Sequence, residues 1–151
     1  MMTPAGEEHG GIANEIAYLL TRFVKERDLG RVFAAETGFQ IASKPDTVRA
    51  PDAAFVSKER MAKQLAKGFR QGAPDLAVEV LSPGDTASEM QAKVQDWLRA
   101  DTRQVWVVDP ARRTVSIYRP SAPMEVFSDS DELKAEDLFP GLRLSVGDVF
   151  P

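Results

Sequence analysis

The chain has 151 residues and a formal net charge of -4 at pH 7, which suits a single domain over residues 1–151 with one sizeable core. It contains no cysteine and one histidine, which excludes disulfides, thiolate metal sites, cysteine nucleophiles and multi-histidine metal sites. No apolar run approaches the roughly 20 residues of a membrane helix, and no signal-peptide pattern is present. We therefore expect a cytoplasmic protein with no membrane partner, whose chemistry rests on carboxylates, lysines, hydroxyls and an oxygen-ligated metal ion.

The first third of the chain predicts one helix followed by two strands. We expect residues 1–8 to be flexible. Apolar residues from Ile12 to Val24 then recur at helical spacing, which predicts an amphipathic helix ending near Gly30. Residues 31–41 and 48–56 have the composition of strands, and Pro51 interrupts the second one early.

The remainder predicts a strand, a helix and a hairpin. Residues 57–72 are basic and form a helix or loop, whereas residues 74–82 are almost continuously apolar, as in a central strand covered on both faces. Thr86 and Glu89 form a capping-box pattern for a helix reaching about Ala100. Residues 104–108 and 114–118 predict a hairpin, and the acidic residues 121–151 a C-terminal wrap. This order indicates a single α/β or α+β domain.

Glu79 is the unusual residue of the central strand. Strand alternation places it on one face with Asp75 and Ala77. A carboxylate in the middle of such a strand must be paired, hydrogen-bonded, protonated or bound to a metal. Either a buried carboxylate satisfied by a cation or a functional acid in a cleft fits the pattern.

Two further acids accompany Glu79. Asp52 follows Pro51 in the neighbouring candidate strand, and Asp75 begins the central strand. Each of them alone is compatible with a turn or a strand start. Clustered carboxylates repel one another unless a divalent cation lies between them, and ligation by oxygen alone suits Mg²⁺ or Mn²⁺.

Lys93 lies on the rim of the apolar stripe of the predicted second helix, not on its solvent face. A lysine stem that packs on apolar surface would explain this position. An ammonium group directed toward the carboxylates, where it would orient or activate water beside a metal, explains it equally well.

These residues carry a resemblance to a known family. The segments RAPD (49–52), PDLAVEVLSPGD (74–85), Lys93 with Trp97-Leu98, and VWVVDPARRTVSIYRP (105–120) together resemble the bacterial Uma-two family of restriction endonucleases, a branch of the PD-(D/E)XK nuclease superfamily. The resemblance covers residues 9–150. It implies a restriction-endonuclease-like mixed sheet flanked by helices, and an endonuclease that hydrolyses DNA phosphodiester bonds.

The resemblance also implies roles for single residues. Asp52 and Glu79 take the places of the two metal-binding acids, for Mg²⁺ or Mn²⁺. Leu81 occupies the usual lysine position, so the catalytic lysine is displaced to Lys93 on the following helix, and Asp75 is an auxiliary catalytic residue at the edge of the site. The basic segment is a candidate to contact DNA phosphates, or else a solvated face; its residues are Lys58, Arg60, Lys63, Lys67 and Arg70.

Several alternatives stay open at this level. A catalytically silent nuclease-like scaffold that binds nucleic acid or a protein partner has the same sequence features. His9 and Glu15 are expected to have structural roles, and strands 104–108 or 114–118 offer surfaces for a homodimer. The net charge does not exclude DNA, because residues 121–151 hold seven acids and two bases while residues 1–120 are near neutral.

Overall fold

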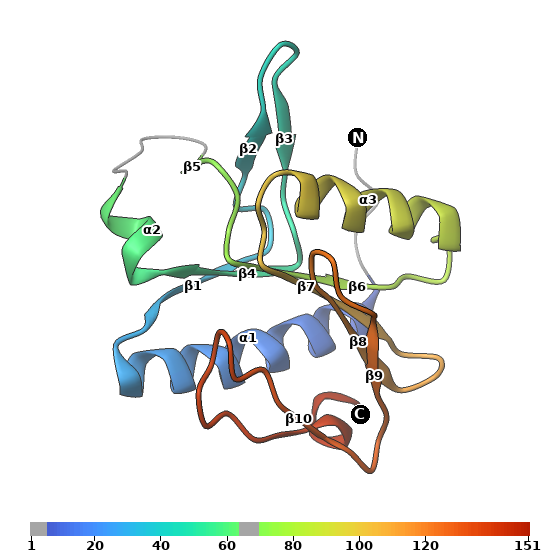
Figure 1. The fold of residues 1–151 in the computed structure, drawn as a ribbon. Helices are drawn as coiled ribbons and strands as arrows, with labels where there is room; N and C mark the ends of the chain where they lie inside the picture. The colour runs from blue at the N-terminus through green and yellow to red at the C-terminus, as the bar shows by residue number, and fades with distance from the viewer. Residues whose placement is uncertain (1–5, 64–69) are drawn as a thin grey trace.

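The computed structural model describes residues 6–63 and 70–151 and places the central strands between helices (Figure 1). The helices are α1 (Glu7–Arg27), α2 (Lys58–Ala62) and α3 (Ala87–Arg99), and a 3-10 helix, η1 (Val146–Val149), lies near the C-terminus. The strands are β1 (Gly30–Ala34), β2 (Phe39–Ala42), β3 (Thr47–Arg49), β4 (Ala53–Ser57), β5 (Arg70–Gln71), β6 (Leu76–Val80), β7 (Gln104–Asp109), β8 (Thr114–Tyr118), β9 (Glu125–Phe127), β10 (Glu132–Leu133) and β11 (Leu144–Ser145).

The main sheet is mixed. Its strand order within the described residues is β1-β4-β6-β7-β8-β9. The parallel pair β6 and β7 is joined through α3, and the other neighbouring pairs are antiparallel. A parallel pair needs a crossover connection, and a helix is its usual form. The fold is therefore the mixed sheet flanked by helices that the sequence predicted.

Two hydrophobic clusters cover the two faces of this sheet. One cluster packs α1 and the C-terminal residues 133–150 against residues such as Phe55, Val78 and Trp106. The other packs α3 and Phe39 against Ala54, Ala77 and neighbouring residues. Figure 1 shows α1 and α3 on opposite sides of the sheet. Because Val78 and Ala77 belong to different clusters, the alternation predicted for the central strand is confirmed.

Several predicted elements are confirmed by their local signals. Thr86 is the N-cap of α3, and its side chain accepts a hydrogen bond from the Glu89 backbone N–H at 3.1 Å. The hairpin of β7 and β8 forms as predicted. The apolar stripe of α1 is buried from Ile12 to Val24.

Other boundaries differ from the prediction. Helix α1 begins at Glu7, so Glu7 and Glu8 belong to the helix and not to a flexible segment. The predicted strand 31–41 is two strands in different sheets, separated by a turn at which Glu36 has a φ of 71°. The predicted strand 48–56 is likewise split into β3 and β4 around Pro51, since proline donates no ladder hydrogen bond.

The homodimer suggested by the sequence stays a prediction, but the two strands named for it lie inside the sheet. Strand β7 pairs with β6 and β8, and β8 pairs with β7 and β9, so neither of them is an edge of the sheet.

No helix among the described residues is long and apolar enough to cross a bilayer.

Gly30 is required where the chain passes from α1 into β1. Its φ is +152°, and a Cβ atom added there would lie 2.1 Å from the carbonyl oxygen of Val56. Only glycine allows β1 to approach β4 so closely at this point. This close approach lets β1 begin its pairing with β4 directly after α1.

Candidate active site

Strand register places Asp52 beside Glu79. Ala53 of β4 pairs with Val78 of β6, and the backbone N–H of Asp52 donates to the Val78 carbonyl at 3.0 Å. The next residue outward on each strand is Asp52 on one and Glu79 on the other. Two carboxylates that are 27 positions apart in the sequence therefore become neighbours through one antiparallel pairing.

The Asp52 carboxylate is contacted by two elements. Its Oδ2 atom accepts a hydrogen bond from the Val80 backbone N–H at 2.7 Å. The same oxygen lies 3.3 Å from Nε2 of His9, in the first turn of α1. The side chain is 22% exposed, so this carboxylate is fixed in place and still reachable from solvent.

Glu79 is the buried member of the pair, with 6% of the residue exposed. Its Oε2 atom accepts a hydrogen bond from the Trp97 indole N–H at 3.0 Å. Burial is the largest influence on this carboxyl group and raises its pKa to about 7, although the Trp97 hydrogen bond opposes that shift. The neighbouring charge of Asp52 raises the pKa further, as expected for two close carboxylates.

Two cations act on the same carboxyl group. The charges of Lys93 on α3 and Arg49 at the end of β3 each lower the pKa of Glu79. Lys93 is half-buried and forms no hydrogen bond or ion pair with the described residues. Arg49 forms an ion pair with Asp96 of α3 at 2.5 Å, which ties β3 to that helix. The structure thus brings Asp52 and Lys93 close enough to Glu79 for both of their charges to act on its carboxyl group.

The donor set fits a magnesium-like ion bound through few protein ligands. Within the described residues, Oδ1 of Asp52 and Oε1 of Glu79 accept no hydrogen bond, so each carboxylate keeps one oxygen available. No group of three or more His, Cys, Asp or Glu side chains suited to a metal occurs in residues 6–63 and 70–151. Mg²⁺ usually retains several waters and binds through one or two carboxylates plus substrate phosphate. Two carboxylates therefore suffice for such an ion.

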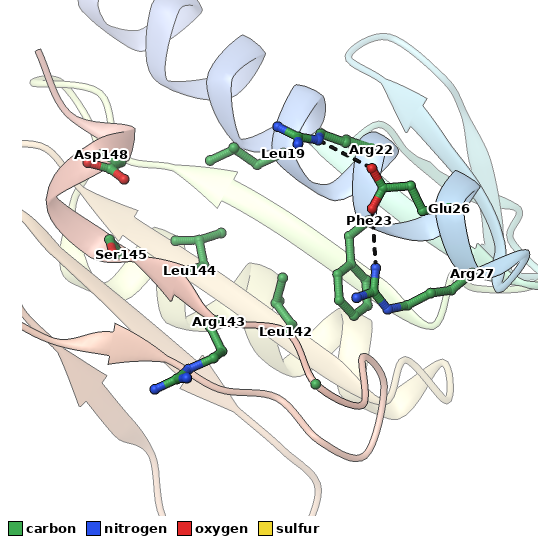
Figure 2. A pocket seen from close by; sticks show the side chains of 11 residues that line it. Leu19, Arg22, Phe23, Glu26, Arg27, Leu142, Arg143, Leu144, Ser145 and Asp148 are labelled. Carbon is green, nitrogen blue, oxygen red and sulfur yellow. Dashed lines mark hydrogen bonds and ion pairs between the residues drawn. The ribbon is translucent and has the colours of Figure 1, made fainter.

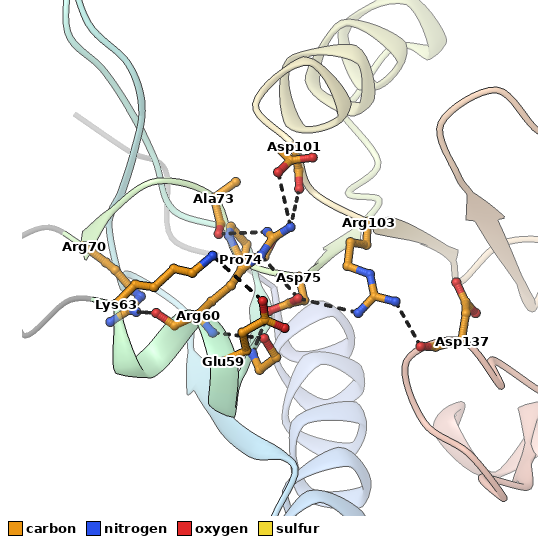
Figure 3. Close-up of polar contacts among 11 residues, drawn as sticks. Glu59, Arg60, Lys63, Arg70, Ala73, Pro74, Asp75, Asp101, Arg103 and Asp137 are labelled. Carbon is orange, nitrogen blue, oxygen red and sulfur yellow. Dashed lines mark hydrogen bonds and ion pairs between the residues drawn. The ribbon is translucent and has the colours of Figure 1, made fainter.

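Asp75 lies in a different environment (Figure 3). Its carboxylate accepts a hydrogen bond from the Ser57 backbone N–H at 2.6 Å and forms ion pairs with Arg60 at 3.4 Å and Arg103 at 3.8 Å. The side chain is 2% exposed. These contacts join the start of β6 to β4, α2 and β7, so the structure favours a structural role over the auxiliary catalytic role expected from the sequence.

The basic segment is used largely within the protein. Arg60 donates to the carbonyls of Ala73, Pro74 and Asp101, and Arg70 donates to the Arg60 carbonyl at 2.7 Å. The exposed lysines of the segment form ion pairs, Lys58 with Asp28 and Lys63 with Glu59. Lys67 lies outside the described residues. The contacts of Arg60 favour a structural role for it, and phosphate contact by the basic segment stays a prediction.

A pocket of about 340 Å³ lies elsewhere, between α1 and the segment around β11 (Figure 2). Apolar side chains form part of it, and charged groups of both signs surround them. Neither Asp52 nor Glu79 lines it. Its lining residues are Leu19, Arg22, Phe23, Glu26, Arg27, Gly141, Leu142, Arg143, Leu144, Ser145 and Asp148. The pocket is thus separate from the carboxylate pair.

Both the fold and the sequence match known proteins. A mixed sheet with helices on both faces also occurs in the crystal structure of a "putative nuclease belonging to DUF820" from Anabaena variabilis ATCC 29413. That structure matches with a TM-score of 0.84 and 25% sequence identity, over 99% of this chain and 83% of that chain. The chain belongs to the Uma2 family, described as "Putative restriction endonuclease", whose model matches residues 1–147. No curated protein matches it. The family predicted from the sequence is confirmed.

Three residues around the carboxylates were missed as site residues in the sequence. Trp97 was placed on the apolar stripe of its helix, and Arg49 was used only as part of the RAPD segment. His9, expected to be structural, contacts Asp52 directly. Periodicity could not identify any of them, because each reaches its partner through tertiary packing. Glu15 is half-buried and forms no hydrogen bond or ion pair with the described residues.

Proposed function

We propose that this protein is a metal-dependent endonuclease that hydrolyses phosphodiester bonds of DNA. The observation that carries the proposal is the pairing of Asp52 with a buried Glu79 under the influence of Lys93. A buried carboxyl group whose pKa lies near neutrality, beside a second carboxylate and a lysine, is an arrangement typical of functional sites. Membership of a family described as restriction endonucleases supports DNA as the substrate.

Asp52 and Glu79 would hold a Mg²⁺ or Mn²⁺ ion through their available oxygens. The Val80 carbonyl adds a candidate oxygen donor, because it lies on the same edge of β6 as the Val80 N–H that contacts Asp52. When bound, such an ion polarises the phosphoryl oxygen and lowers the pKa of a bound water. The two carboxylates contribute the negative charge that attracts the ion to this end of the sheet.

Lys93 would orient the attacking water and offset the charge that develops on the phosphate. Water adds to phosphorus, one P–O bond of the DNA backbone breaks, and the leaving oxygen takes up a proton. The hydrolysis produces one phosphomonoester end and one hydroxyl end. Lys93 is suited to this position because no carboxylate among the described residues holds its ammonium group in an ion pair.

A cleavage assay with matched variants tests the proposal. Tag-free protein is incubated with supercoiled, linear and single-stranded DNA in the presence and absence of Mg²⁺ or Mn²⁺, and Mn²⁺ binding is measured by electron paramagnetic resonance. Asp52→Asn and Glu79→Gln should lose both metal binding and cleavage. Lys93→Ala should keep metal binding and lose cleavage. Asp148→Asn and Lys25→Ala, both exposed, serve as controls and should behave like the wild type.

The outcomes separate enzyme from scaffold. Metal-dependent cleavage that disappears with Glu79→Gln supports the proposal. Metal binding without cleavage of any DNA or RNA favours the catalytically silent scaffold. Cleavage of both strands at one site would also favour a homodimer, which light scattering of the protein in solution would test.

A further inference from the structure

His9 is the residue that links α1 to the carboxylate pair. It lies in the first turn of α1, on the sheet face opposite α3. Its side chain is 15% exposed, and its Nε2 atom is 3.3 Å from Oδ2 of Asp52. The contact spans 43 positions in the sequence, so it is a product of the fold and not of local chain geometry.

The contact completes the environment of one oxygen of Asp52. Oδ2 receives the Val80 backbone N–H at 2.7 Å and faces the imidazole of His9. One donor belongs to the rigid central strand and the other to the helix packed below it. Both contacts are made to the same oxygen, Oδ2, while Oδ1 accepts no hydrogen bond from the described residues.

The other ring nitrogen of His9 indicates which tautomer is present. Nδ1 is buried and has no hydrogen-bond partner. A proton on Nδ1 would be a buried donor without an acceptor, and it would leave the Nε2 lone pair facing the carboxylate oxygen of Asp52. The tautomer with its proton on Nε2 leaves only an acceptor without a partner at Nδ1 and directs an N–H toward Asp52.

We propose that His9 is a positioning residue of the metal site, acting through Asp52. Its Nε2–H holds Oδ2 so that Oδ1 is presented to the ion, in the manner of an outer-shell hydrogen bond that orients a metal-binding carboxylate. This inference rests on the proposed function, because a positioning role requires that Asp52 bind a metal ion. The His9–Asp52 contact itself is testable without any metal.

A set of three variants separates donation from packing. His9→Gln keeps an N–H donor at a similar reach, His9→Phe keeps a ring without a donor, and His9→Ala removes both. Loss of an outer-shell partner typically costs about 10- to 100-fold in metal affinity. We expect His9→Phe and His9→Ala to weaken Mn²⁺ binding by about that factor, and His9→Gln to retain most of the wild-type affinity. Circular dichroism and thermal unfolding establish that each variant is folded.

The metal-free readout uses the fact that His9 is the single histidine of the chain. In tag-free protein labelled with ¹⁵N, the imidazole signals belong to this residue alone. At pH 8 we expect the Nε2–H tautomer, and we expect its signal to change in Asp52→Asn. Addition of Mg²⁺ should leave Nε2 protonated, because His9 contacts the carboxylate and not the ion.

Three results would overturn the inference. They are an Nδ1–H tautomer in the metal-free protein, an unchanged Mn²⁺ affinity in both His9→Ala and His9→Phe, and loss of the Nε2 proton when Mg²⁺ binds, which would make His9 a direct ligand. A wild-type protein that shows the Nε2–H tautomer but binds no metal would instead contradict the proposed function. The two failures are therefore distinguishable.

Discussion

The indole of Trp97 donates a 3.0 Å hydrogen bond to Oε2 of Glu79, inside the cluster that packs α3 on the sheet. Trp97 is fully buried, and Phe39 lies against its ring at 6.3 Å between ring centroids. A buried indole N–H is thus directed at the carboxylate in the middle of β6. This pair joins the hydrophobic core to the candidate active site.

Removing the indole N–H should make stability more dependent on pH. The hydrogen bond from Trp97 lowers the pKa of Glu79, so Trp97→Phe should raise that pKa above 7. The variant should therefore lose more stability at pH 8, where Glu79 is ionised, than at pH 5; the extra loss is about 1.5–3 kcal/mol for a hydrogen bond to a charged group. Urea unfolding at the two pH values measures this difference.

Trp106 provides the matched control. Its indole N–H donates to Gln104 at 2.9 Å on the opposite side of the sheet. Trp106→Phe should reduce stability equally at both pH values, because the carboxyl group that contacts Gln104, that of Asp137, has a lowered pKa and is ionised at pH 5 and at pH 8. An equal loss at pH 5 and pH 8 in Trp97→Phe would contradict the coupling between Trp97 and Glu79.

Glu79→Gln should stabilise the protein at alkaline pH. The pKa of Glu79 is about 7 in the folded protein, compared with 4.5 for a glutamate that is not buried. Between these values the folded state keeps a proton that the unfolded chain has released, so the free energy of unfolding falls as pH rises. One pKa unit corresponds to about 1.4 kcal/mol, which makes the full loss about 3 kcal/mol.

The glutamine variant remains neutral and should therefore exceed the wild type in stability by up to about 3 kcal/mol at pH 8, with little difference near pH 4. Chemical denaturation from pH 4 to pH 8 without metal tests this expectation. Glu36→Gln, at an exposed turn, should leave the pH dependence unchanged. If the stability of the wild type and of Glu79→Gln changed with pH in the same way, burial would not raise the pKa of Glu79.

Asp75→Asn should affect stability and not metal binding. The Asp75 carboxylate compensates Arg60 and Arg103 while almost completely buried, and breaking such a pairing costs about 3–5 kcal/mol. Urea unfolding measures the loss, and the Mn²⁺ affinity of the folded fraction should equal that of the wild type. Asp101→Asn, whose carboxylate is 94% exposed beside Arg60, is the control and should be close to neutral. A lower metal affinity in Asp75→Asn would show that Asp75 contributes to the metal site.

Gly30→Ala should destabilise the fold severely. The added methyl group would meet the Val56 carbonyl oxygen at 2.1 Å, and a strained backbone of this kind costs about 1–3 kcal/mol before the clash is relieved. Gly11→Ala is the matched control, because a Cβ there has open space in the interior of α1. It should stabilise the protein by about 0.5–1 kcal/mol. Thermal unfolding of both variants tests the pair, and a neutral Gly30→Ala would refute the close approach of β1 to β4.

Local sequence signals predicted the elements around the site well. Apolar periodicity placed α1 and α3, the Thr86 cap marked the start of α3, and the alternation of β6 put Glu79 on the face of Ala77. These signals depend on neighbours within a few residues, which is why one sequence suffices to detect them. The split of residues 31–41 was missed because the one turn-type residue in residues 35–38 is Gly38, and an isolated glycine also fits a bulge in a continuous strand.

The sequence by itself determined the class of fold, the family and the chemical types available: carboxylates, a lysine and no thiol. Only the tertiary structure decided which groups meet. Alternation assigns Asp75 and Glu79 to one face of β6, but their partners come from other elements, Arg60 and Arg103 for one and Trp97 for the other. His9 reaches Asp52 for the same reason: strand pairing and helix packing join residues far apart in the chain, and periodicity describes only a residue's own element.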